Sequence, residues 1–86
     1  MRQIKFEAAA LEELEEWIHV HPRTASKILD LIKEISKTPF EGKGKPEPLK
    51  HKLKGLWSRR INQEHRLIYE VTESFISIVA CKGHYE

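Results

Sequence analysis

The sequence contains one cysteine and no long apolar run. Cys81 has no partner for an intrachain disulfide, which fits a reducing compartment, and the cytoplasm is the expected location. The longest mainly apolar segment, Phe75 to Cys81, is far shorter than the roughly 20 residues of a membrane-spanning helix, so no membrane partner is expected. The first residues lead directly into a charged stretch from Glu7, which predicts that there is no secretory signal. A chain of 86 residues predicts a single domain, 1–86.

The first half of the sequence predicts one short strand and two helices. Apolar and polar residues alternate from Gln3 to Phe6, which is the period of a strand. In the segments Glu7–Val20 and Pro22–Thr38, apolar residues recur at intervals of three and four, which is typical of amphipathic helices. The predicted apolar stripes are Leu11, Leu14, Trp17 and Ile18 in the first helix and Ala25, Ile28, Leu31, Ile32 and Ile35 in the second. His21-Pro22 separates the two helices, because proline is tolerated at the first helical position but not in the interior. Thr38-Pro39 is expected to end the second helix.

The second half predicts a loop followed by three strands. Residues 39–48 contain three of the four prolines and two of the four glycines, and a loop this long in a small domain is usually functional or mobile. The segments Leu56–Ile61, His65–Val71 and Phe75–Cys81 are rich in strand-forming residues, and the gaps between them suit hairpins. The order β-α-α-β-β-β predicts an α+β fold. In this fold a small antiparallel sheet carries two N-terminal helices on one face and the first strand at its edge.

Positive charge is concentrated in one part of the chain. The formal net charge is only +2, but residues 41–60 carry seven basic and two acidic side chains. Such a segment attracts phosphate, and Lys43, Lys45 and Lys50 are its candidate phosphate ligands. By charge alone, a solvated loop kept soluble by lysine is the slightly more ordinary interpretation.

Five residues of the second half could act on a phosphodiester. Leu67, Tyr69 and Val71 alternate along their strand and are expected to face the core, which places Arg66 on the sheet face away from the helices. A three-residue hairpin loop would place Arg60 opposite Arg66. Opposed arginines repel each other unless an anion lies between them. Glu47, between two prolines and near the lysines, is a candidate general base, and His84-Tyr85 offers a proton donor. The ordinary alternatives are unrelated surface arginines, a loop glutamate and a frayed terminal tail.

Other patterns predict no further site. The histidines are scattered and the single cysteine has no neighbouring ligand, so neither a metal site nor a cofactor is expected. The segment Gly42-Lys43-Gly44-Lys45 lacks the spacing of a P-loop. Trp17 is expected in the core, and Trp57 either in the core or, less favoured, at a partner-binding surface.

Four ordered blocks of the sequence closely resemble the YoeB/Txe toxins of bacterial toxin–antitoxin pairs, which belong to the RelE superfamily. The blocks are Thr38–His51, Gly55–Ile61, Glu64–Tyr69 and Ala80–Tyr85. The similarity covers nearly the whole chain, and residues 38–85 carry its specific part. It implies a compact fold related to microbial ribonucleases. It also implies metal-free cleavage of mRNA in the A site of the 70S ribosome, where a 2′-OH attacks the adjacent phosphate and translation is inhibited.

The resemblance also implies roles for individual residues. By position, Glu47 would be the general base and His84 the general acid, while Arg66 would stabilise charge on the phosphorane. Tyr85 would orient the substrate or the acid. Flanking positions of the family's active site correspond to Lys50, Arg60 and Glu64.

Two positions depart from the family's pattern. Gly83 stands where an aromatic residue commonly precedes His-Tyr, which would loosen how His84 is held. Glu86 follows Tyr85 and adds a carboxylate that would either raise the pKa of His84 or repel RNA. Neither departure removes a catalytic group.

The expected partners follow from the same resemblance. They are a cognate antitoxin of the YefM/Axe type, mRNA on the ribosome, operator DNA bound through the antitoxin complex, and often a second copy of the chain. Two alternatives stay open. A same-fold toxin of the ParE type would act on DNA gyrase without the acid–base pair. A non-catalytic module would bind nucleic acid or the antitoxin through the lysine-rich loop alone.

Overall fold

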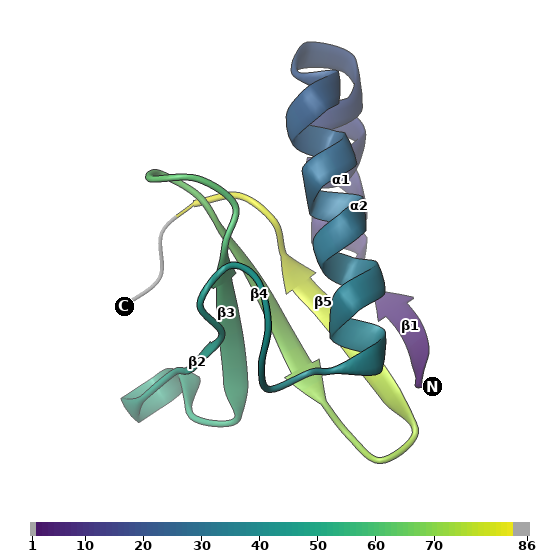
Figure 1. Cartoon of the computed structure of the whole chain (residues 1–86). Coiled ribbons are helices and arrows are strands. Elements are labelled where there is room, and N and C mark those ends of the chain that lie inside the picture. Colours follow the sequence, from purple (N-terminus) through teal and green to yellow (C-terminus); the bar gives the residue numbers. More distant parts are fainter. Residues whose placement is uncertain (1, 84–86) are drawn as a thin grey trace.

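Two helices lie on one face of a five-stranded sheet in the computed structural model, which describes residues 2–83 (Figure 1). The strands are β1 (Gln3–Phe6), β2 (Glu47–Pro48), β3 (Leu56–Arg60), β4 (Arg66–Val71) and β5 (Phe75–Ala80). The helices are α1 (Ala8–Val20), α2 (Pro22–Lys37) and a short 3-10 helix, η1 (His51–Leu53). This order confirms the predicted β-α-α-β-β-β arrangement and adds one strand, β2.

The sheet has the order β1-β5-β4-β3-β2. β3, β4 and β5 form the predicted antiparallel meander, and β1 occupies the predicted edge. The pairing of β1 with β5 is parallel, however, so the sheet is mixed rather than wholly antiparallel. No hairpin links these two strands, because the helices and the other strands lie between them in the chain, and a parallel pairing is therefore accessible.

β2 corrects the expectation that residues 39–48 form only a loop. Glu47 pairs with Ser58 and Pro48 pairs with Trp57. Proline is compatible with this position because an edge strand needs hydrogen bonds on one side only. The candidate base therefore lies on a strand of the sheet.

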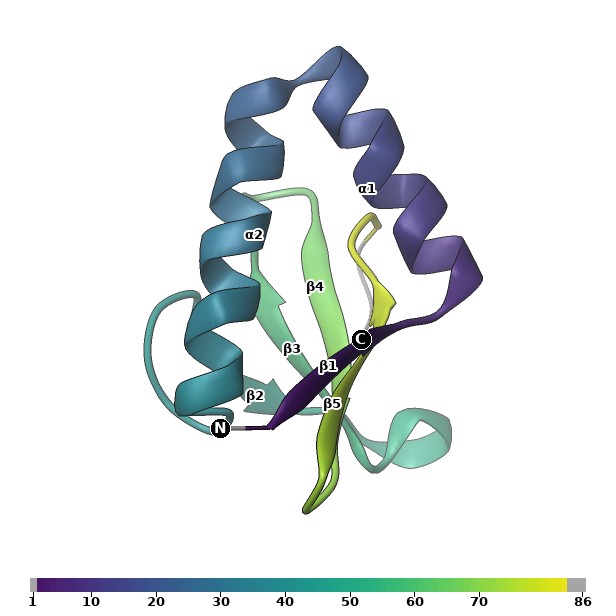
Figure 2. The same ribbon diagram turned by 90° about the vertical axis from the view of Figure 1, so that its right-hand side faces the viewer.

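The two helices cover the sheet unequally. Figure 2 shows them joined by a short connection and diverging from it. In α2 the whole predicted stripe is buried; it consists of Ala25, Ile28, Leu31, Ile32 and Ile35. In α1, Leu14 and Trp17 are buried as expected, but Leu11 and Ile18 are 55% and 49% exposed. The buried residues of α1 are therefore Ala10, Leu14 and Trp17.

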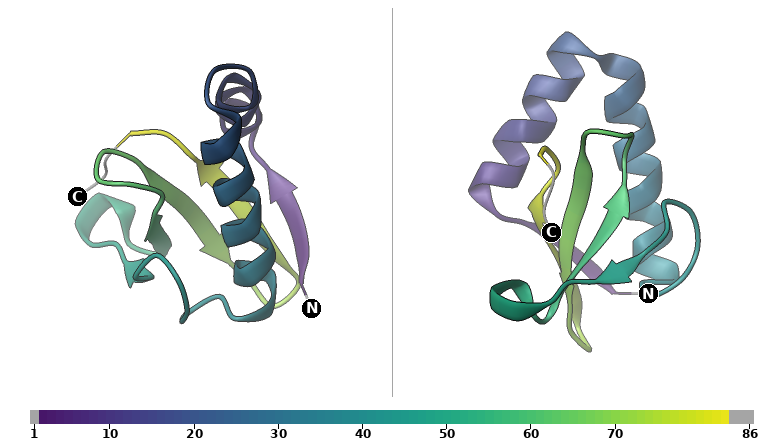
Figure 3. Two further views of the ribbon diagram at one scale, coloured as in Figure 1. Left: turned by 45° about the horizontal axis from the view of Figure 1, so that its top comes forward. Right: turned by 90° about the vertical axis from the view of Figure 1, so that its left-hand side faces the viewer.

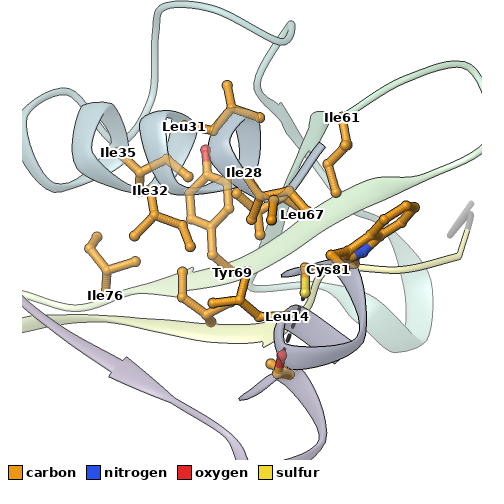
Figure 4. Close-up of a cluster of buried hydrophobic side chains, with 14 residues drawn as sticks. Leu14, Ile28, Leu31, Ile32, Ile35, Ile61, Leu67, Tyr69, Ile76 and Cys81 are labelled. Atoms are coloured by element: carbon orange, nitrogen blue, oxygen red, sulfur yellow. Dashed lines mark hydrogen bonds between the residues drawn. The ribbon is translucent and has the colours of Figure 1, made fainter. Parts of the chain in front are cut away.

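The core lies between α2, α1 and the inner face of β4 and β5 (Figure 4). Leu67 and Tyr69 are fully buried there, as predicted, and Val71 packs against their cluster and is partly buried. Trp57 also packs against the core and stacks on Phe40, with ring centroids 4.9 Å apart. Trp57 is only partly buried, so it lies at the margin of the core and not within it.

Helix α1 holds the end of β5 through the backbone of Cys81. The indole N–H of Trp17 donates to the Cys81 carbonyl at 2.7 Å, and the Cys81 N–H donates to the Glu13 carboxylate at 2.9 Å. The thiol is buried, and burial together with the nearby Glu13 charge raises the pKa of Cys81 to about 12. The thiolate, which is the reactive form, is thus suppressed in the folded protein.

We expect Cys81 to react with a thiol reagent at pH 8 only as fast as the chain unfolds. The raised pKa also means that the unfolded chain ionises first, so stability should fall as pH rises above about 9. Thiol labelling with and without denaturant measures the first effect, and urea unfolding between pH 8 and 10 measures the second. Rapid stoichiometric labelling of the native protein would contradict the assigned burial.

Within residues 2–83, no helix combines the length and the apolar character that crossing a membrane requires.

Candidate active site

An arginine pair lies on the sheet face turned away from the helices. Leu67 and Tyr69 belong to the core, and because side chains alternate along a strand, Arg66 and Ile68 belong to the opposite face. Arg60 lies directly opposite Arg66 in the register of β3 and β4, which confirms the predicted pairing. Figure 3 (right) shows this face, with β3 and β4 in front of the helices. Ile68 is only 1% exposed, so other residues cover the centre of this face.

Glu47 lies on the same face. The register places Glu47 opposite Ser58, and Ser58 opposite Ile68, so the three form one row across β2, β3 and β4. The Arg60–Arg66 pair forms the neighbouring row, two residues farther along the same strands. Two strand spacings, roughly 10 Å, separate the backbones of β2 and β4. Glutamate and arginine side chains are long enough to approach one anion from the two sides of that gap.

The Arg66 side chain also braces the β3–β4 turn. Its Nη1 donates to the carbonyl of Asn62 at 2.7 Å and to that of His65 at 3.1 Å. The Nε and Nη2 groups carry three further donors for an anion. Glu64 lies in the same turn with its side chain 86% exposed, and its carboxylate is 3.9 Å from the His65 ring. The turn therefore holds one nitrogen of the Arg66 guanidinium, and the Glu64 carboxylate remains accessible to a partner or substrate.

The chain passes alongside the start of β4 at Gly83. The Arg66 N–H donates to the Gly83 carbonyl at 2.8 Å, and the Gly83 N–H donates to Nδ1 of His65 at 2.9 Å. Gly83 has a φ of 91°, which a residue with a side chain adopts only with strain, so glycine suits this position. The predicted roles of His84 and Tyr85, and the extra carboxylate of Glu86, fall outside the described residues.

A buried arginine, which the sequence analysis did not single out, organises the lysine-rich loop. The Arg59 side chain is fully buried, and its Nη1 donates to the Glu34 carboxylate at 2.9 Å. Its Nε donates to the Tyr69 hydroxyl at 3.2 Å, and that hydroxyl donates to the Pro39 carbonyl at 2.7 Å. The guanidinium also donates to three loop carbonyls, those of Thr38, Glu41 and Lys43. Strand alternation could have predicted that Arg59 is buried, because it places Arg59 on the same sheet face as Trp57, opposite the core residue Leu67.

The same network shapes the turn at Gly42. The Lys43 N–H donates to the Glu34 carboxylate at 2.6 Å, and this hydrogen bond, together with Arg59, keeps the pKa of Glu34 below its ordinary value. A Cβ on Gly42 would lie 1.8 Å from that carboxylate oxygen, so only glycine fits. Farther along, the Gly44 carbonyl accepts a hydrogen bond from the Arg60 N–H at 2.7 Å. The loop is thus tied both to α2 and to the strand that carries Arg60.

The structure brings together only part of the predicted phosphate-binding set. Lys43, Arg60 and Arg66 line one groove, whereas Lys45 and Lys50 are exposed outside it. Among residues 2–83, no three histidine, cysteine, aspartate or glutamate side chains gather in a way that could hold a metal ion.

Residues 6–85 match the family described as the YoeB-like toxin of bacterial type II toxin–antitoxin systems. The match covers nearly all of the chain. The chain belongs to this YoeB-like toxin family. The toxin YoeB of Escherichia coli K12 is 58% identical over 69 residues, which is 80% of this chain and 82% of that protein.

Solved structures of family members share the whole fold. A YoeB/ParE toxin from Agrobacterium tumefaciens superposes with a TM-score of 0.93 at 40% identity, covering 96% of this chain and 99% of that one. A YoeB dimer from Staphylococcus aureus gives 0.90 at 42% identity, with 98% of both chains covered. A YoeB–YefM complex from the same organism gives 0.88 at 42% identity, with 99% of both chains covered.

Proposed function

We propose that this toxin is a ribosome-dependent endoribonuclease that cleaves mRNA in the A site and inhibits translation. The observation that carries the proposal is the arrangement of Glu47 and the Arg60–Arg66 pair in neighbouring rows of one sheet face. The carbonyl of Gly83, the residue before His84, accepts a hydrogen bond from the backbone N–H of Arg66 in the same region. A base, an acid and a cation around one phosphate suffice for this reaction, without metal or cofactor.

The proposed reaction is an in-line attack within the RNA strand. Glu47 removes the proton of the 2′-OH as the bond from O2′ to phosphorus forms. Arg66 offsets the charge that develops on the phosphorane, with Arg60 beside it. His84 gives a proton to the 5′ oxygen as the bond from phosphorus to O5′ breaks, and Tyr85 orients the acid or the substrate. The products are a 2′,3′-cyclic phosphate and a 5′-OH.

The remaining predicted residues act on binding. Lys43, Lys45 and Lys50 attract the phosphate backbone without reading its sequence, and Glu64 flanks the site from the β3–β4 turn. An exposed site of this kind is weakly selective, so the ribosome supplies much of the substrate positioning. The proposed location is accordingly the bacterial cytoplasm.

We propose a YefM-like antitoxin and a second copy of the chain as its partners. The support is that the Staphylococcus aureus YoeB forms a complex with YefM and also a dimer. Binding of operator DNA through the antitoxin complex extends the same proposal.

Cell-free translation tests the proposed activity directly. Purified toxin added to a translating extract should produce new transcript ends at codons in the A site, mapped by primer extension, and addition of the antitoxin should abolish them. A parallel supercoiling assay with DNA gyrase addresses the ParE-like alternative, to which the name of the Agrobacterium relative points. Intact transcripts together with inhibited gyrase would overturn the ribonuclease proposal. Salt-sensitive RNA binding with neither activity would leave a non-catalytic binding module.

A further inference from the structure

A groove of about 810 Å³ runs between α2 and the β3–β4 hairpin. Its cations come from four segments of the chain; they are Lys27, Lys43, Arg60 and Arg66. We propose that this groove binds the phosphate backbone of the RNA strand next to the scissile bond, with Lys27 as a phosphate ligand that the proposed mechanism does not include. The inference rests on the proposed function and extends its substrate contacts beyond the sheet face.

The balance of charge in the groove favours an anion. Two carboxylates, those of Asp30 and Glu34, also line it. The Glu34 carboxylate is already engaged, because it accepts hydrogen bonds from Arg59 at 2.9 Å and from the Lys43 N–H at 2.6 Å. Asp30 forms no ion pair with another described residue. Four cations therefore face one uncompensated acid, and phosphate is the matching ligand.

The groove is continuous with the proposed catalytic face. Arg60 and Arg66 form the opposed pair on the sheet and also line the groove. A strand whose scissile phosphate lies at this pair therefore meets the groove on one side. Leu31 and Ile61 give the groove an apolar floor, against which a ribose or a base could pack. Its volume lies within the range of ordinary ligand sites, roughly 300–1,000 Å³.

An acidic segment of a partner protein is the rival occupant. The shared arginines favour RNA, because the proposed mechanism requires the same two side chains to hold the scissile phosphate. The test below includes this rival as an outcome that rejects our inference.

Three exposed positions of α2 give a matched set of single-charge variants. Lys27→Gln removes a cation that lines the groove, Asp30→Asn removes its uncompensated acid, and Lys33→Gln removes an exposed cation of the same helix that does not line it. None of the three side chains is buried, so each variant should keep the fold, which thermal unfolding verifies. The probe is a single-stranded RNA with a 2′-O-methyl group at the scissile position, which binds but is not cleaved.

The expected changes have opposite signs. Lys27→Gln should weaken RNA binding about threefold to tenfold and reduce the slope of log affinity against log salt by about 0.7, the value for one lost contact to a single strand. Asp30→Asn should strengthen binding, because it removes a charge that repels phosphate. Lys33→Gln should change affinity less than twofold. Fluorescence anisotropy from about 50 to 200 mM salt measures all three.

Equal effects of Lys27→Gln and Lys33→Gln would overturn the inference, because they would indicate general charge attraction. Unchanged RNA affinity with weakened antitoxin binding in Lys27→Gln would assign the groove to a protein partner instead. Failure of the proposed function is distinguishable. The Lys27 and Asp30 effects on the uncleavable RNA would persist even if the wild-type toxin left ribosome-bound mRNA intact.

Discussion

Replacing Glu47 by glutamine should reduce mRNA cleavage by about two to four orders of magnitude, the usual contribution of a general base. Glutamine keeps the shape of the side chain but does not accept the proton of the 2′-OH. Because Glu47 is exposed on an edge strand, stability should change by less than about 0.5 kcal/mol. Single-turnover cleavage of mRNA on programmed ribosomes measures the loss, and thermal unfolding verifies the fold.

Glu41→Gln is the matched control for this substitution. Glu41 lies in the lysine-rich loop that leads to β2, with its side chain exposed, and only its backbone carbonyl takes part in the Arg59 network. The control removes the same charge and should cleave at nearly the wild-type rate. Comparable losses in both variants would indicate that loop charge, and not a base at Glu47, governs the reaction. Wild-type cleavage by Glu47→Gln would exclude it as the base.

Replacing Arg59 by methionine should lower the free energy of unfolding by about 3–5 kcal/mol, the range found when one partner of a buried ion pair is removed. The guanidinium is fully buried and supplies donors to Glu34, to Tyr69 and to three loop carbonyls, all of which would lose them. Such a loss is a large share of the stability of a small domain. Lysine in its place should recover only part of it, because one ammonium cannot reproduce the planar fork.

Urea unfolding of Arg59→Met measures this loss, and Arg60→Met is its control on the same strand. Arg60 is exposed, so its replacement should change stability by less than about 0.5 kcal/mol. Hydrogen exchange gives a local readout, since the Lys43 amide should exchange faster only in Arg59→Met. Equal stability of the two variants, or unchanged protection of the Lys43 amide, would mean that Arg59 does not hold the loop.

Much of this arrangement was predictable from local patterns. The apolar stripe of α2 and the alternation around Tyr69 were sufficient to predict the helix, the strand and their buried faces. A three-residue gap between two strands indicated one register in which Arg60 faces Arg66, because a short hairpin constrains the pairing, and the structure selects that register over the alternative of unrelated surface arginines. The family resemblance added roles for Glu47 and Arg66, and these remain proposals.

Other features were decided by contacts between distant parts of the chain. The proline and glycine content of residues 39–48 predicted a loop and gave no indication of β2. This strand forms because Glu47 and Pro48 pair with the edge of β3. The exposure of Leu11 and Ile18 reflects the one-sided packing of α1. Arg59 was overlooked because a buried charge is stabilised only by partners from α2, β4 and the loop, which are far away in the sequence.

The sequence by itself therefore determined the elements, their order and the residue types available for phosphate chemistry, because periodicity and hairpin length act over a few residues. Only the tertiary structure decided which cations share a groove and which arginine anchors the loop. Those outcomes depend on long-range packing, where burial and hydrogen-bond satisfaction select one arrangement among many that the local pattern allows.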